Sequence, residues 1–291
     1  MKYLQLLRVS HWIKNLFFFL PVFFAGDFFK LIPIELFLGF FYFSLTASSI
    51  YVINDFRDRK KDALHPVKKF RPLASNSISP ILALSLAAFL LIIGIGGSLL
   101  LNKVFFIYLI SYFILNLAYS LGVKNIPIVD VLCIAIGFVI RIHAGAILAD
   151  VPLSNWLVLM VFLLALFMAL GKRRDDVILQ LESGLEVRKA IDGYNKEFLN
   201  VGITIVSSVI LVCYLMYCMS PEVVARLKTT HLFYTSIFVL MGILRYLQII
   251  FVKNDSGSPT KILYKDLFLQ ITLLLWILSF YFLIYRKDFM F

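Results

Sequence analysis

The chain has 291 residues, 61% of them apolar, and a mean hydropathy of +0.92. So little polar surface cannot cover a water-soluble globule of this length, which excludes an ordinary soluble domain and indicates a membrane protein. The net charge of +11 does not indicate nucleic-acid binding, because the Lys and Arg residues lie between apolar runs and form no separate basic domain.

The apolar runs predict about nine membrane-spanning helices. Each run is about 20 residues long and lacks the alternation of a β-barrel strand, so helices are favoured. In chain order the predicted spans are 14–30, 33–53, 80–101, 104–121, 127–149, 153–171, 197–219, 230–251 and 265–285. The basic segment before the first span is expected to lie at the membrane interface and to remain in the mature protein. We therefore predict an all-α polytopic membrane helical bundle that forms one domain over residues 1–291.

The basic residues between the spans predict the orientation of the bundle. If the amino terminus is cytoplasmic, 21 of the 28 Lys and Arg residues lie in cytoplasmic segments, 6 lie outside, and Arg141 lies within a span. Cytoplasmic segments carry the excess of positive charge in membrane proteins. The long polar connections 54–79 and 172–196 are then both cytoplasmic and are expected to hold the active site. The membrane is expected to be the plasma membrane of a prokaryote.

An acidic run follows the second span, with the pattern Asn54-Asp55-x-x-Asp58-x-x-x-Asp62. If the helix continues past the membrane surface, the three carboxylates lie within about 60° of one another around its axis, and the Asn54 amide lies on the same side. Carboxylates so close repel, which predicts a compensating cation; oxygen ligands favour Mg²⁺ bound together with substrate phosphates. The alternative is a set of solvated surface charges balanced by the basic residues between them.

Basic residues near this run are candidates for substrate binding. His65, Lys68 and Arg71 follow it and are suited to holding phosphate groups, although the positive-inside rule alone also explains them. Arg141 lies deep in the span 127–149, where a charge is costly unless it faces a cavity or a partner. We favour a functional role for Arg141 over a structural contact with a carboxylate, a tyrosine or a carbonyl group.

Further candidates lie at the ends of other spans. Lys14 and Asn15 begin the first span at the depth of a lipid phosphate, a place where many membrane proteins carry a lysine. Lys172 and Asp176 are spaced i, i+4, which is also the spacing of a plain surface ion pair.

The acidic run resembles the first acidic motif of the UbiA superfamily of intramembrane prenyltransferases, which have nine transmembrane helices and hold Mg²⁺ and diphosphate with this motif. The flanking sequence most resembles the decaprenyl-phosphate phosphoribosyltransferase family, and the resemblance runs from about residue 8 to residue 285. The segments that carry it are Arg8-Val-Ser-His-Trp-Ile-Lys14-Asn15, His65-Pro-x-Lys68-x-x-Arg71-Pro-x-Ala-Ser75, Tyr119-Ser120 with Lys124 and Asp130, Gly137-Phe-x-x-Arg141-x-x-Ala-Gly145, Gly171-Lys172-Arg173 and Arg245-Tyr246.

One departure from the superfamily pattern bears on the donor. The second acidic motif of the aromatic-acceptor enzymes, Asp-x-x-x-Asp, is missing from the segment 172–196, where Lys172-Arg173-Arg174-Asp175-Asp176 stands instead. This segment matches the phosphoribosyltransferase branch and makes a prenyl diphosphate donor less favoured.

The resemblance implies transfer of 5-phosphoribosyl from phosphoribosyl pyrophosphate to a long polyprenyl phosphate, with release of diphosphate, in cell-envelope biosynthesis. It implies Mg²⁺ on Asp55 and Asp58, with Asp62 direct or through water. It also implies that Lys172, Arg173 and Arg141 assist the leaving diphosphate, and that His65, Lys68 and Arg71 hold the ribose phosphate. Two alternatives stay open: transfer of a prenyl group from a prenyl diphosphate to an aromatic acceptor, and transport or flipping of lipid-linked sugars.

Overall fold

The computed structural model describes residues 2–26, 33–64, 67–184, 189–253 and 259–285. Within these ranges, eight helices are long and apolar enough to cross a membrane, and Val9–Ala25 forms a shorter apolar helical segment. The predicted all-α membrane bundle is confirmed, and the chain is an integral membrane protein. The eight long segments are α3 (Ile34–Leu64), α4 (Pro80–Leu101), α5 (Lys103–Leu121), α6 (Val129–Ala149), α7 (Asn155–Ser183), α8 (Lys196–Met219), η5–α10 (His231–Phe251) and α12 (Leu267–Tyr285).

The remaining helices are short. They are α1 (Lys2–Leu6), η1 (Val9–Phe19), α2 (Leu20–Ala25), η2 (Lys68–Phe70), η3 (Val123–Asn125), η4 (Lys189–Gly193), α9 (Pro221–Leu227) and α11 (Pro259–Lys265).

The predicted first span, 14–30, differs from the structure. Over its described part the chain forms the 3₁₀ helix η1 and then the one-and-a-half-turn helix α2, and residues 27–30 lie outside the described ranges. Pro21 explains part of this difference. It has no N–H group to donate to the carbonyl four residues earlier, so an α-helix cannot run through it without a lost bond. Within the described residues, this helical segment is shorter than a full membrane span.

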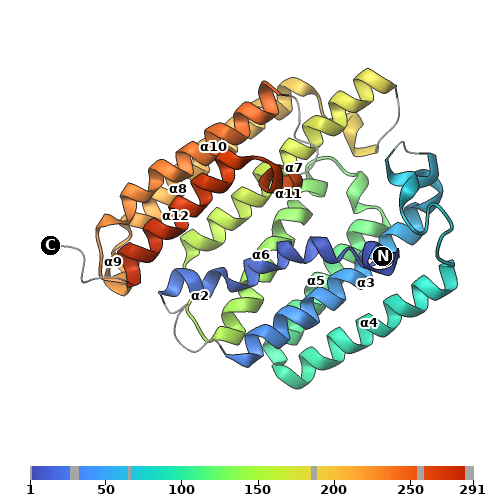
Figure 1. Ribbon diagram of the computed structural model, residues 1–291, viewed down its shortest axis with the longest axis horizontal. Coiled ribbons are helices and arrows are strands. Elements are labelled where there is room, and N and C mark those ends of the chain that lie inside the picture. Colours follow the sequence, from blue (N-terminus) through green and yellow to red (C-terminus); the bar gives the residue numbers. More distant parts are fainter. Residues whose placement is uncertain (1, 27–32, 65–66, 185–188, 254–258, 286–291) are drawn as a thin grey trace. The chain divides into compact units, whose positions relative to one another are not determined.

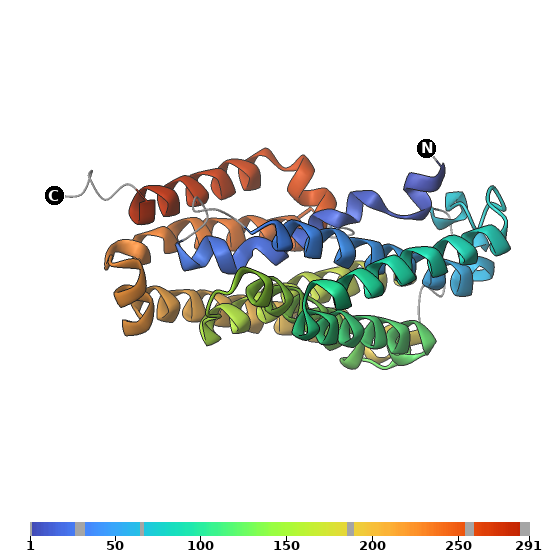
Figure 2. The same ribbon diagram turned by 90° about the horizontal axis from the view of Figure 1, so that it is seen from below.

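The chain divides into two compact units, and helix α6 contributes residues to both. The first unit comprises residues 1–124 and 137–153. In it, α3 packs along α4, α5 and η1, as Figures 1 and 2 show. Phe18, Phe43 and Phe105 are fully buried where these helices meet. The prediction of one domain over the whole chain stays a prediction.

Close packing in the first unit depends on a glycine of α6. A Cβ atom added at Gly145 would collide with the backbone of Phe18 on η1, so the absence of a side chain at this position permits the close approach of the two segments. The outward faces of α4 remain apolar, with Ile92 72% and Leu100 91% exposed. Such surface is unfavourable in water and suits contact with lipid.

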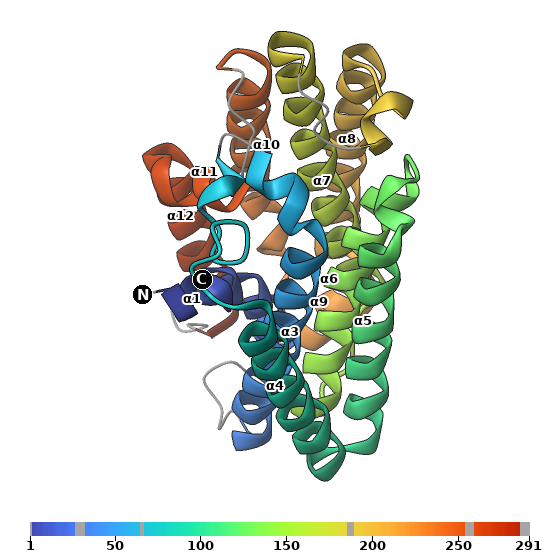
Figure 3. The same ribbon diagram turned by 90° about the vertical axis from the view of Figure 1, so that its right-hand side faces the viewer.

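The second unit comprises residues 125–136 and 154–291. Helices α7 and α8 pack side by side, as Figure 3 shows, and α10 packs along α12. Helix α7 does not end with its apolar run. It continues through Lys172–Asp176 to Ser183, so the predicted polar connection 172–196 begins as helix.

Candidate active site

The acidic run lies on helix α3, which continues without a break to Leu64. The helix therefore continues past the end of its apolar run, as the prediction of a shared face for the three carboxylates required. Asp55 and Asp62 are buried, with 3% and 5% of their surface exposed, and Asp58 is partly exposed. Buried carboxylates need partners of opposite charge, and the structure supplies them.

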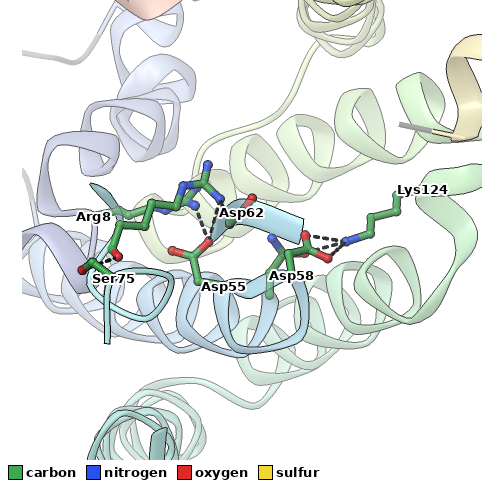
Figure 4. Close-up of polar contacts among 8 residues, drawn as sticks. Arg8, Asp55, Asp58, Asp62, Ser75 and Lys124 are labelled. Atoms are coloured by element: carbon green, nitrogen blue, oxygen red, sulfur yellow. Dashed lines mark hydrogen bonds and ion pairs between the residues drawn. The ribbon is translucent and has the colours of Figure 1, made fainter. Parts of the chain in front are cut away.

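Three basic residues from separate segments neutralise the three carboxylates (Figure 4). Arg71 Nη1 lies 3.1 Å from Asp55 Oδ1 and 2.7 Å from Asp62 Oδ2, so one nitrogen bridges two carboxylates. Lys124 Nζ lies 2.7 Å from both carboxylate oxygens of Asp58, and it donates a longer bond of 3.3 Å to the amide oxygen of Asn54. Lys124 comes from η3, directly after α5.

Arg8 is the third basic residue, and it was not among the predicted site residues. Its Nη2 donates to Asp55 Oδ1, and its guanidinium lies 5.0 Å from the centre of the Tyr51 ring. Its backbone has φ 49° and ψ 46°, the left-handed conformation, which is unfavourable for a residue with a Cβ atom. A strained residue that holds a buried carboxylate is a candidate functional residue. The only sequence signal for it was its place in the segment that resembles the phosphoribosyltransferase family.

The three carboxylates do not converge on one point. Among the described residues, no group of three or more His, Cys, Asp and Glu side chains is suited to hold a metal ion. Asp55 and Asp62 nevertheless converge on a single nitrogen of Arg71. Mg²⁺ is usually held by one or two carboxylates together with substrate phosphates and water. This pair of oxygen donors therefore fits Mg²⁺, whereas Asp58 is directed to Lys124.

Arg141 lies in the interior of the first unit with 4% of its surface exposed. Its Nε donates to Asn15 Oδ1 (2.9 Å), its Nη1 to the carbonyl of Gly137 (2.7 Å) and its Nη2 to the hydroxyl of Tyr112 (2.7 Å). The Asn15 amide nitrogen in turn donates to Ser44 Oγ (2.9 Å). Three aromatic rings lie 4.6–5.4 Å from the guanidinium carbon, those of Phe43, Tyr112 and Phe138. These tyrosine and carbonyl contacts belong to the structural alternative considered for Arg141.

A second charged cluster lies within the second unit. Arg173 on α7 is 1% exposed, and its Nε lies 2.5 Å from Asp130 Oδ2 of α6. Its Nη1 lies 2.6 Å from Asp176 Oδ2, three residues further along α7. Asp130 is fully buried and also accepts a hydrogen bond from the hydroxyl of Tyr194 (2.7 Å). Three predicted site residues, Asp130, Arg173 and Asp176, are thus brought together.

Tyr194 completes this second cluster and was not predicted. Its hydroxyl donates to Asp130 and accepts a hydrogen bond from the backbone N–H of Ile128 (2.6 Å). Burial, and then the hydrogen bond to the Asp130 carboxylate, raise the pKa of Tyr194 above its ordinary value. The phenol therefore stays protonated at neutral pH and remains a donor to Asp130. A lone tyrosine between two polar segments gives no pattern that sequence inspection would single out.

The other predicted site residues lie on three separate helices or outside the described residues. Lys14 is half-buried on η1, Lys68 is half-buried on η2, and Lys172 is exposed on α7. His65 lies outside the described residues.

The chain is similar to known proteins in both sequence and fold. The model of the UbiA prenyltransferase family matches residues 15–274. A decaprenyl-phosphate phosphoribosyltransferase from Mycolicibacterium smegmatis is 33% identical over 285 residues, which cover 94% of this chain and 89% of that protein. A protein of the same name from Corynebacterium glutamicum is 28% identical over 279 residues, which cover 94% of this chain and 84% of that protein.

Solved structures show the same fold. A UbiA homologue from Archaeoglobus fulgidus, solved with GPP and Mg²⁺, superposes with a TM-score of 0.73 at 22% identity, covering 98% of this chain and 99% of that one. A UbiA homologue from Aeropyrum pernix K1 superposes with a TM-score of 0.68 at 16% identity, covering 93% and 98%. The family match over most of the chain and the enzymes among its relatives together lead to one conclusion. The chain belongs to the UbiA prenyltransferase family and is a membrane-embedded transferase.

Proposed function

We propose that this protein transfers the 5-phosphoribosyl group of phosphoribosyl pyrophosphate to a long-chain polyprenyl phosphate and releases diphosphate. The observation that carries the proposal is the 33% identity, over 94% of the chain, to a relative named for decaprenyl-phosphate phosphoribosyl transfer. The basic segment Lys172–Arg174 supports it, because it stands where aromatic-acceptor enzymes carry their second acidic motif. The chain 1–291 acts in this proposal as one catalytic domain.

We assign the donor's diphosphate to the acidic face of α3. The resemblance implies Asp55 and Asp58 as the main ligands; because Asp58 is directed to Lys124, we propose instead that Asp55 and Asp62 would hold Mg²⁺ there, with Asp58 direct or through water. When bound, Mg²⁺ neutralises charge that develops on the leaving diphosphate. Arg71 and Lys124 lie against these carboxylates; Mg²⁺ between Asp55 and Asp62 would replace the contact with Arg71 and leave its guanidinium for phosphate oxygens.

The reaction breaks one bond and forms one bond at the anomeric carbon of the ribose. The bond to the diphosphate oxygen breaks through an oxocarbenium-like state, and an oxygen of the lipid phosphate forms the new bond. The lipid phosphate is already an anion, so it needs positioning more than a strong general base. Lys14 and Asn15 would position it at the entry of the first apolar segment, and Asn15 is already fixed by Ser44 and Arg141.

The remaining basic residues are proposed to bind the phosphates. His65, Lys68 and Arg71 would hold the 5-phosphate of the ribose, and Lys172 with Arg173 would assist the departing diphosphate. We place this chemistry on the cytoplasmic side of a prokaryotic plasma membrane, on the distribution of Lys and Arg between the spans.

The test incubates the purified protein in detergent with Mg²⁺, labelled phosphoribosyl pyrophosphate and a polyprenyl phosphate. We expect label in the lipid fraction and an equal amount of released diphosphate. A parallel reaction supplies a prenyl diphosphate and an aromatic acid. Activity in that reaction alone would overturn the proposal in favour of an aromatic-acceptor prenyltransferase.

A matched pair of variants makes the test specific to the site. Asp62→Asn removes a buried carboxylate that lies against Arg71, whereas Asp150→Asn changes an exposed carboxylate at the end of α6. We expect loss of transfer with the first variant and ordinary transfer with the second. Equal activity of the two variants would remove Asp62 from the metal site.

A further inference from the structure

An open groove of about 540 Å³ lies on the surface of the second unit and is lined by residues of α7, α8 and α10. Its lining combines basic, amide and apolar side chains, among them Arg174, Lys196, Asn200, Val201, Ile205 and Phe251. None of these belongs to the residues assigned to phosphoribosyl transfer. The groove lies where α7 leaves its apolar run, where α8 begins and where α10 ends.

Arg174 gives the groove a fixed positive charge. It is 2% exposed, its Nε donates to Asn200 Oδ1 (2.8 Å), and its Nη1 donates to the backbone carbonyl of Ile250 (2.8 Å). Its guanidinium carbon lies 5.2 Å from the centre of the Phe251 ring. A guanidinium held on three sides by α8 and α10 loses little conformational freedom when it meets an anion.

The lining as a whole is positive. Lys196, at the start of α8, is exposed and lies on the groove with Arg174, and no lining residue is acidic. Asp175, beside Arg174 on α7, interacts electrostatically with it and does not line the groove. Two basic side chains on a groove whose lining residues include no carboxylate are suited to a phosphate group.

The rest of the groove is apolar and faces outward. Val201 and Ile205 on α8 are 59% and 57% exposed. Ile205 lies nine positions after Lys196, which is about 13 Å along a helix. A ligand that follows the groove therefore meets positive charge at one end and apolar surface at the other, which is the arrangement of a phospholipid headgroup and the first part of its acyl chain.

We propose that this groove binds an anionic phospholipid of the surrounding bilayer, with the phosphate at Lys196 and Arg174 and an acyl chain along Val201 and Ile205. Basic pockets between membrane helices are known sites for anionic headgroups. A bulk phospholipid is favoured over the polyprenyl phosphate acceptor because occupancy follows concentration, and bilayer phospholipid is by far the more abundant.

The test measures lipid retention directly and does not depend on enzyme activity. The full chain is delipidated in detergent, titrated with phosphatidylglycerol or phosphatidylcholine, and bound lipids are counted by native mass spectrometry. We expect one phosphatidylglycerol to bind more tightly than phosphatidylcholine. Lys196→Ala should weaken phosphatidylglycerol binding about five-fold, the ratio that corresponds to about 1 kcal/mol per basic side chain at an anionic membrane surface.

Two further variants separate the groove from general surface charge. Thr204→Trp places a large ring in the groove without changing its charge, and it should weaken phosphatidylglycerol binding as well. Lys228→Ala removes an exposed lysine at the carboxyl-terminal end of α9, and it should bind lipid like the unchanged protein. Equal binding by all these proteins would overturn the proposal.

Competition identifies the source of the phosphate. Added polyprenyl phosphate or inorganic phosphate should displace phosphatidylglycerol only weakly. Displacement by polyprenyl phosphate at lower concentration than phosphatidylglycerol would make the groove an acceptor site, and displacement by inorganic phosphate alone would make it a site for a soluble anion. Either result would overturn the proposal.

Discussion

Replacing Arg141 by lysine should strongly destabilise the first unit, although it keeps the positive charge. The guanidinium donates three hydrogen bonds in three directions, to Asn15, Gly137 and Tyr112. An ammonium group on a shorter stem can satisfy only one of these acceptors, and each bond from a charged donor contributes about 1.5–3 kcal/mol. Two lost bonds, partly offset by relaxation of the surroundings, give an expected loss of about 3 kcal/mol in the free energy of unfolding.

The assay is reversible unfolding in mixed micelles, followed by circular dichroism and by tryptophan fluorescence in a background where Trp156 and Trp276 are replaced by Phe, which leaves Trp12, a residue of the same unit that donates to Ser48. A change below about 0.5 kcal/mol would refute the reasoning, because it is the size expected for a solvated surface side chain.

Arg141→Met is the companion variant. It removes the buried cation together with its desolvation cost, so it should destabilise less than lysine does. Because Arg141 also fixes Asn15, which is proposed to position the lipid phosphate, transfer per folded molecule should fall about ten-fold. A much larger loss at full folding would support the predicted contact between Arg141 and substrate.

Four further outcomes are expected. Asp55→Asn should lower phosphoribosyl transfer about 100-fold at every Mg²⁺ concentration, and full activity at ordinary Mg²⁺ would contradict its place in the site. Arg8→Gly should relieve about 1 kcal/mol of backbone strain, yet it should reduce transfer because the contact with Asp55 is lost. Arg8→Lys should keep more activity than Arg8→Gly. Unchanged kinetics of the Arg8→Gly enzyme would count against a role for this contact. Tyr194→Phe should lower the melting temperature because Asp130 loses a donor, which thermal unfolding in detergent would detect or exclude. The hydrogen bond from Arg245 lowers the pKa of Asp266 below its ordinary value. The stability that the Asp266 carboxylate adds is therefore present above its unfolded pKa of about 4 and is lost as pH falls through the folded value. The free energy of unfolding of Asp266→Asn should be lower than that of the unchanged chain at pH 7, and the two values should converge in acid.

The helices were predictable from the sequence because lipid imposes a simple rule on each apolar run. The exception is the first span, where the chain forms the 3₁₀ helix η1 packed against α3, and Pro21 lies at the start of the next helix; a hydropathy pattern expresses neither feature. The continuation of α7 past Lys172 was not predicted, because a charged segment after an apolar run is typical of a connection between spans.

The acidic face of α3 was predictable because helical periodicity fixes it within one element. Its partners were harder to predict. Arg71 and Lys124 were identified by resemblance, but their pairing with particular carboxylates depends on tertiary contacts across 9 and 66 residues. Arg8 lies 47 residues from Asp55, and its left-handed backbone has no residue signature such as glycine.

The contact between Lys124 and Asp58 has a consequence for the history of the family. Loss of either charge alone leaves the other uncompensated and partly buried, at a cost in stability. If the pair is mainly structural, positions 58 and 124 should change together among related sequences, as contacting residues do. If Asp58 is instead retained for its substrate, position 58 should stay aspartate while position 124 varies. The pattern of substitution across relatives therefore distinguishes a carboxylate kept for a neighbour from one kept for chemistry.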